Sequence, residues 1–413
     1  MMNDPSTIES PKPRSKTRSV LILGVIVMAT IIILLIPSLF DIDSIDDTDL
    51  LPPRSLQVDP RENVFTEIVR VHGLLVEPEE YFDFELGSSD PETSDEERLH
   101  ELVAANEAYY AELLPLLDRP HFIVSDPKTF EDTRPHVLAI RSAGIWIGHR
   151  HDALILRGKA GEAAELALLW ERAIRRHYEH VPSLIEFLVF IALYDASLDR
   201  LIKSACQAGV DGDALRRLSE AAAKPIDLFA AYNIAMCHEY RMARNFIDSL
   251  SSRYGSVARP FVFKPNRTRR ELARVTRTCL EAVRTRDISA LTELEQGLGQ
   301  GGQLELIVSG NSVGQSLVRM LTPSYSTAIQ KLIRVERSQP LYRAAIALRR
   351  YEVKRGQLPA TLEELVPEFL EPGVLNPDDP ILFERDLRWI GYEKPGDLKA
   401  TAAPGIEVTT WVP

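Results

Sequence analysis

Two short histidine clusters are the strongest candidates for chemistry in this chain. Residues three apart on a helix share a face, so two imidazoles and a neighbouring carboxylate could bind a zinc-type metal ion and activate water. The candidate ligands are His149, His151, His177, His180 and Glu179, with Asp152 beside the first pair. A metal-dependent hydrolase is therefore one hypothesis, and it requires the two clusters to meet.

The same histidines also have a structural interpretation. His177 and His180 come at the end of an expected helix, where polar or protonated groups interact favourably with the helix dipole. If the two helices that carry the clusters pair antiparallel, the clusters lie at opposite ends. His149 and His151 are only two residues apart, which suits a shared helical face less well.

Other catalytic motifs are missing from the sequence. It contains no GxSxG elbow, phosphate-binding loop or EF-hand, and Cys237-His238-Glu239 lacks the second histidine of HExxH because Met242 stands there. Glu186 stands in an apolar run, as a buried catalytic carboxylate would. Ser183-x-x-Glu186 is however a capping box, which places Glu186 in a first helical turn. We therefore predict no catalytic residue and no cofactor.

Composition excludes some classes of protein. The 413 residues are 45% hydrophobic, enough for a sizeable core. The net charge of −12 is concentrated between Asp41 and Arg98, and no basic face indicates nucleic-acid binding. The three cysteines lack CxxC spacing, so we expect buried free thiols at Cys206, Cys237 and Cys279, with a Cys206–Cys237 disulfide as the alternative.

Val20–Phe40 is an apolar run without a charged residue, and as a helix it would reach roughly 30 Å, the thickness of a bilayer core. Basic residues precede it and aspartates follow, which predicts a cytoplasmic N-terminus and an extracytoplasmic body. A cleaved signal peptide is the alternative, but the run is long and lacks a small-residue cleavage site. We predict a disordered cytoplasmic tail over 1–19, a single uncleaved anchor in a bacterial inner membrane over 20–40, and an acidic tether over 41–61.

Residues 62–340 are predicted to form a body of antiparallel helix pairs. Apolar residues recur at helical spacing, and Gly and Pro separate the segments. Ser94-x-x-Glu97 and Thr268-x-x-Glu271 are expected to cap two of the helices. The expected helices are 94–117, 135–157, 161–178, 184–208, 213–222, 227–252, 268–285, 288–296 and 312–355, the last broken near Pro323.

Residues 341–413 are expected to finish the long helix and form a small cap. Gly356 suits a left-handed helix end, and Thr361-x-x-Glu364 opens a short helix. Short strands are expected over 381–383, 387–392 and 406–412. The predicted fold class is mainly α, with a single N-terminal transmembrane helix, an extracytoplasmic bundle of antiparallel helix pairs and a small C-terminal α+β cap.

The C-terminal segment resembles a tail shared by bacterial membrane-anchored helical proteins of planctomycete type. The matching residues are Arg350-Tyr351, Gly356, Pro359, Leu362, Leu365-Val366-Pro367 and Asn376-Pro377-Asp378-Asp379-Pro380, with Gly310-Asn311-x-x-Gly314 and Val181–Ile185 upstream. The resemblance implies an architecture and a compartment but no activity. The Gly356-x-x-Pro359 step also resembles the end of the pseudopilin helix, but the pseudopilin processing site before the apolar helix is lacking.

Arg253–Arg286 is rich in arginine, and three interpretations stay open. It could contact anionic lipid headgroups, contact the acidic tether of another copy, or form a solvated helix face.

The favoured function is a non-enzymatic, membrane-anchored envelope protein whose body is a scaffold or binding module for another envelope protein. It predicts a concave or apolar helical surface. The alternative is the metal-dependent hydrolase. Besides the bilayer and a protein partner we expect no nucleic acid, and the sequence predicts no oligomeric state.

Overall fold

The computed structural model is mainly helical, as predicted, with eleven α-helices and one small sheet among its described residues. The residues that the structure describes are 41–52, 58–76, 95–123, 134–224, 226–253, 263–300, 311–377, 379–386, 388–392 and 407–409. The expected tail 1–19 and anchor Val20–Phe40 lie outside them. Within the described ranges, no helix has the length and apolar character needed to cross a bilayer.

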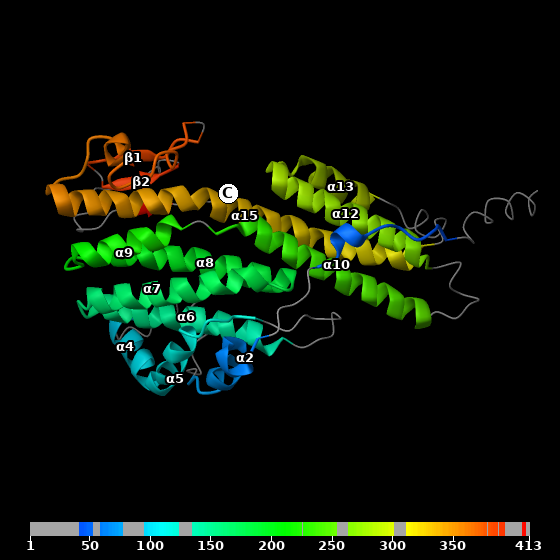
Figure 1. Cartoon of the computed structure of the whole chain (residues 1–413), viewed down its shortest axis with the longest axis horizontal. Helices are drawn as coiled ribbons and strands as arrows, with labels where there is room; N and C mark the ends of the chain where they lie inside the picture. The colour runs from blue at the N-terminus through cyan, green and yellow to red at the C-terminus, as the bar shows by residue number, and fades with distance from the viewer. Residues whose placement is uncertain are drawn as a thin grey trace, which may run out of the picture.

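Four antiparallel helices form the centre of the body, each within a few residues of its predicted range (Figure 1). They are α6 (Pro135–Leu156), α7 (Ala160–His177), α8 (Leu184–Ala205) and α9 (Gly212–Ala223). The turns between them are short, and Gly158 and Gly209 supply positive φ angles of 69° and 88°, which cost glycine little. Short turns oblige consecutive helices to pack antiparallel.

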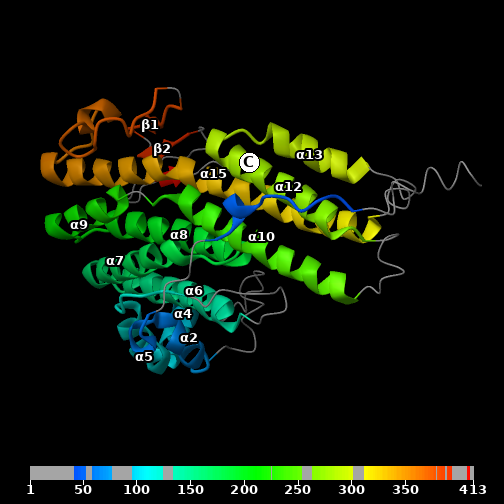
Figure 2. The same cartoon turned by 45° about the vertical axis from the view of Figure 1, so that its right-hand side comes forward.

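Three shorter helices cover the outer side of α6 (Figures 1 and 2). They are α2 (Val64–His72), α4 (Asp95–Ala105) and α5 (Glu107–Leu117), and a 3-10 turn at Pro60–Glu62 precedes α2. The single helix predicted over 94–117 is therefore wrong. The chain breaks at the buried Asn106, whose side-chain amide donates to the Val76 carbonyl and accepts from its N–H. Those bonds to a distant segment compensate for the interrupted helix.

The other side of the body consists of α10 (Leu228–Arg253), α12 (Pro265–Thr285), α13 (Ser289–Gln300) and α15 (Ser312–Arg355). The break predicted near Pro323 is absent, because α15 runs as one 44-residue helix. Packing against α8, α9 and α12 along its length outweighs the lost backbone bond. The cap predicted at Thr268 is also wrong. The helix α12 begins at Pro265, a favourable first position, and the Thr268 hydroxyl donates to the Lys264 carbonyl inside the helix.

A small cap covers the C-terminal half of α15, as predicted (Figure 1). The helix ends at Gly356 with φ 77°, and the Thr361–Glu364 capping box starts a 3-10 turn at Leu362–Leu365. The strands are β1 (Leu382–Glu384), β2 (Trp389–Gly391) and β3 (Glu407–Thr409). β2 pairs antiparallel with β1 and parallel with β3. The described residues that carry the C-terminal resemblance thus form the end of α15 and the turns of the cap.

Residues 41–52, which we call the docked segment, do not behave as a free tether. The Asp41 carboxylate accepts from the N–H groups of Asn266 and Arg267 at 2.9 and 3.1 Å. Asp47 is only 6% exposed and accepts from the Tyr240 hydroxyl at 2.7 Å. The tether prediction is therefore wrong for these residues, because their charges have partners about 200 residues later in the chain.

Two further contacts hold the docked segment. Asp49 receives two bonds from Arg277, at 2.7 and 2.9 Å, and Leu50 is 1% exposed, in a 3-10 turn at Thr48–Leu50 that packs on α10 and α12. Part of the arginine-rich stretch therefore binds an acidic segment of its own chain rather than that of another copy.

All three cysteines are free thiols, so the alternative of a Cys206–Cys237 disulfide is wrong. Cys206 and Cys279 are buried as predicted, and Cys237 is half-buried.

Candidate functional site

The first histidine cluster lies at the C-terminal end of α6. His151 is fully buried, with Nε2 2.8 Å from the Ser204 hydroxyl of α8 and Nδ1 3.1 Å from the Asp152 carboxylate. The His149 ring meets the Trp146 ring edge to face, with centroids 5.4 Å apart. Both nitrogens of His151 thus have protein partners, and the ring ties α6 to α8.

His177 ends α7 and is fully buried among aromatic rings. Phe65, Phe122 and Phe190 lie 5.1 to 6.3 Å away between centroids. Burial in these apolar surroundings lowers the pKa of His177 to about 4, because the charged imidazolium would lose its hydration. The predicted place at a helix end is confirmed, but the ring is neutral near pH 7 and cannot act as a positive charge on the helix dipole.

The structure does not bring the two clusters together. Phe65 contacts the rings of both His136 and His177, so His177 lies beside the start of α6. His151 lies roughly 22 Å further along that helix, at ~1.5 Å per residue. In the described part of the chain no group of three potential ligands could hold a metal ion. The Glu179 side chain is outside the described residues, and His180 ends the turn Tyr178–His180. Among the described side chains, the arrangement that the hydrolase hypothesis requires is not found.

Glu186 lies in the first turn of α8, as predicted, and its carboxylate contacts side chains where a full capping box would have it accept from the Ser183 N–H. The Ser183 hydroxyl accepts from the Glu186 N–H at 3.3 Å and donates to its Oε2 at 2.9 Å. Sequence reasoning missed His136, whose Nε2 lies 2.6 Å from Oε1. In a hydrolytic triad the imidazole stands between the hydroxyl and the carboxylate. Here the carboxylate stands in the middle, so the serine is not activated.

A groove of about 460 Å³ lies at the N-terminal ends of α6 and α8, and we call it the α6–α8 groove. Its apolar lining includes Leu138 and Ile185, which are 55% and 57% exposed and are among the most exposed large apolar side chains described. The lining residues are Arg134, Val137, Leu138, Arg141, Ile185, Val189 and Glu239. The sequence contains a signal for this groove, because Leu138 and Ile185 are large apolar residues at exposed positions of these two helices.

Some polar atoms beside the α6–α8 groove have hydrogen-bond partners and others do not. Glu239 is buried, which raises the pKa of its carboxyl, and its Oε2 accepts from the Leu184 N–H at 3.3 Å. The buried Nε of Arg134 has no acceptor among the described residues. The exposed Arg141 of the same lining could donate to an incoming carbonyl or carboxylate while apolar side chains cover Leu138 and Ile185.

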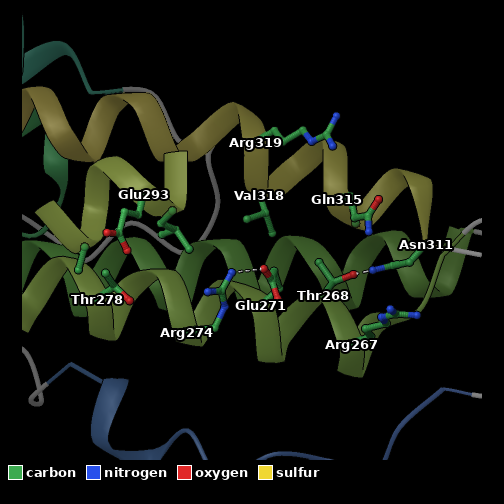
Figure 3. Close-up of a pocket in the computed structure, with 13 residues that line it drawn as sticks. Arg267, Thr268, Glu271, Arg274, Thr278, Glu293, Asn311, Gln315, Val318 and Arg319 are labelled. Atoms are coloured by element: carbon green, nitrogen blue, oxygen red, sulfur yellow. Dashed lines mark hydrogen bonds and ion pairs between the residues drawn. The ribbon is translucent and has the colours of Figure 1, made fainter. Parts of the chain in front are cut away.

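A second groove, of about 620 Å³, lies between α12, α13 and α15 (Figure 3). Arg274 of its lining pairs with Glu271 at 2.6 Å, and the Thr268 hydroxyl lies 3.1 Å from Asn311 Oδ1. Gly314 lets the helices approach, since a Cβ there would lie 1.9 Å from the Thr268 hydroxyl. Figure 3 shows the Arg319 side chain turned away from α12. Helix packing thus explains Asn311 and Gly314 of the Gly310-Asn311-x-x-Gly314 motif, whose Gly310 lies outside the described residues, and Glu271 neutralises Arg274 within the groove.

Comparisons with known proteins add no family to this geometry. No family model matches the chain, and no curated protein or solved structure shows significant similarity to it. The resemblance to planctomycete-type anchored proteins stays a prediction, and any function must be argued from the two grooves and the surfaces around them.

Proposed function

We propose that this chain is a non-enzymatic, single-pass protein of a bacterial inner membrane, whose helical body binds another envelope protein through the α6–α8 groove. The anchor is Val20–Phe40, with the N-terminus cytoplasmic and the body outside. The observation that carries the proposal is the exposure of Leu138 and Ile185 in one groove.

The chemistry of the groove favours a protein partner. Covering one large apolar side chain contributes about 1.5–3 kcal/mol, so the pair offers a useful part of a binding free energy. Arg134 and Arg141 add donors at the same place. The partner segment is expected to carry one or two apolar side chains next to a carbonyl or carboxylate group.

The docked segment supports the role of a presenting body. Because Asp41 and Leu50 are fixed to α10 and α12, the helices are held in one orientation relative to the chain that enters from the anchor. A partner then meets the groove at a fixed place. The resemblance of the C-terminal tail to anchored bacterial proteins agrees with this compartment and is part of the proposal.

The test is a crosslinked pull-down of the full chain from its own membranes. Leu138→Glu with Ile185→Glu should lower recovery of the partner at least about tenfold, because two charges would enter an apolar contact. Val353→Glu is the matched control, since Val353 is 47% exposed on α15 away from the groove. Equal recovery from both variants, or no specific partner from the native chain, would contradict the proposal.

A further inference from the structure

One end of the body gathers three helix ends beside the entry of the docked segment (Figures 1 and 2). There α10 ends at Arg253, α12 begins at Pro265 and α15 begins at Ser312. Asn311 joins the last two, because its Oδ1 accepts from the Lys264 N–H at 2.8 Å. Asp41 lies on the first turn of α12. We call this surface the basic end.

This surface carries more basic than acidic side chains. Leu250–Arg253 and Phe263–Arg270 contain no acidic residue and hold Arg253, Lys264, Arg267, Arg269 and Arg270. Of these, Arg253, Arg267 and Arg270 are exposed. Nearby acids are fewer and largely engaged. Asp41 accepts from α12 backbone N–H groups, and Asp248 pairs with Arg269. Glu271 follows Arg270 but pairs with Arg274, so cations remain in modest excess even with Asp43 counted.

The position of Asp41 sets how far this surface can be from a membrane. Phe40 is the last residue of the proposed anchor, and consecutive Cα atoms are about 3.8 Å apart. The headgroup layer of one leaflet is roughly 5–8 Å deep. The first two turns of α12 rise only about 11 Å from the place where Asp41 is bound. Arg267 and Arg270 are therefore at or next to headgroup depth, whatever the tilt of the helix.

We propose that the basic end lies on the leaflet from which the chain emerges, and that Arg267 and Arg270 bind the phosphate groups of anionic phospholipids there. Guanidinium groups bind phosphate oxygens in pairs, which suits them to this ligand. The inference rests on the proposed anchor for its geometry. It also chooses among the three interpretations of the arginine-rich stretch, since Asp41 and Asp49 are already bound within their own chain.

The experiment uses the full chain in nanodiscs of phosphatidylcholine alone or with about 30% phosphatidylglycerol. Hydrogen exchange of the peptide covering the start of α12 should slow at least about threefold in the anionic discs. Arg267→Glu with Arg270→Glu should abolish that difference, because each cation near an anionic surface changes binding by about fivefold. Arg157→Glu with Arg284→Glu is the matched control, since both arginines are exposed and distant from the basic end.

Vesicle flotation separates this inference from the anchor. A chain that floats with neutral vesicles, with α12 protected only in anionic discs, supports both. Floating with neutral vesicles while α12 exchanges equally in both discs overturns the lipid contact and leaves the anchor standing. If the chain does not float with neutral vesicles, the proposed anchor is wrong. Salt-sensitive binding to anionic vesicles that Arg267→Glu with Arg270→Glu removes would then still support the basic end, and no binding would overturn it.

Discussion

The α6–α8 groove and the basic end arrange charge and apolar surface in opposite ways. At the groove the carboxylate of Glu239 is buried while the apolar side chains of Leu138 and Ile185 are exposed. At the basic end Leu272 is buried while the guanidinium of Arg267 is exposed. The two binding surfaces that we propose therefore suit different partners, an apolar protein segment and a charged lipid headgroup.

This difference separates the two kinds of binding by their response to solution conditions. Covering apolar surface depends little on ionic strength, whereas contact between exposed charges is screened within about 8 Å at physiological salt. Burial of the titratable His177 beside the start of α6 instead makes that region respond to pH. Each prediction below tests one side of the contrast.

The largest expected effect is the pH response around His177. The folded protein lowers the pKa of His177 to about 4, from 6.5, so the unfolded chain binds a proton that the folded chain excludes. Stability should therefore fall as pH falls from about 6.5 to about 4, by up to about 3 kcal/mol, and this loss should be absent above that range. Denaturant unfolding at a series of pH values measures it.

The matched variant for this prediction is His177→Gln, which keeps an N–H donor and does not titrate. Its stability should vary less with pH than that of the native chain across the same window. Parallel curves of stability against pH for the two proteins would mean that the buried imidazole does not control the pH response. The two regions would then not differ in their sensitivity to acid.

A smaller effect is expected from Gly314 near the basic end. Gly314→Ala places a methyl group 1.9 Å from the Thr268 hydroxyl and 2.6 Å from Asn311 Oδ1, so α15 must move from α12. Overpacking of this kind costs about 2 kcal/mol. Gly161→Ala is the control, because nothing lies within 4 Å of a Cβ there and alanine favours a helix. Similar thermal unfolding of both variants would show that the close approach is not needed.

The smallest effect is the salt dependence of the two contacts. Raising sodium chloride from about 50 mM to about 500 mM should remove most of the lipid protection of the start of α12, because screening shortens the range of charge interactions. Capture of the protein partner at the α6–α8 groove should change less than about twofold. Hydrogen exchange and crosslinked recovery in the same samples measure both, and equal losses would remove the distinction.

Much of the helical framework follows from local signals in the sequence. Apolar periodicity, together with Gly158 and Gly209 between helices, predicts α6 to α9 to within a few residues. Gly356 and the Thr361–Glu364 box predict the end of α15 and the start of the cap. These features act within one or two turns of chain, so the sequence contains the information.

The remaining features depend on distant contacts. Asn106 interrupts a helix because its side-chain amide hydrogen-bonds to the backbone of Val76, about 30 residues earlier. The helix α15 continues through position 323 because neighbouring helices pack against it. Asp47 and Asp49 look like part of a solvated spacer in the sequence, but in the structure they accept hydrogen bonds from Tyr240 and Arg277. The candidate site was missed for the same reason, because the α6–α8 groove forms only when α6, α8 and α10 meet.

The docked segment has a mechanical consequence. Ten free residues could extend roughly 33 Å, and a body on such a spacer would sample a wide volume above the membrane. With Asp41 bound to α12 and Leu50 buried, that slack is removed. In the anchored protein that we propose, a force applied by a partner would be transmitted to the anchor at once, and the search for a partner would depend on lateral diffusion of the whole molecule in the membrane plane.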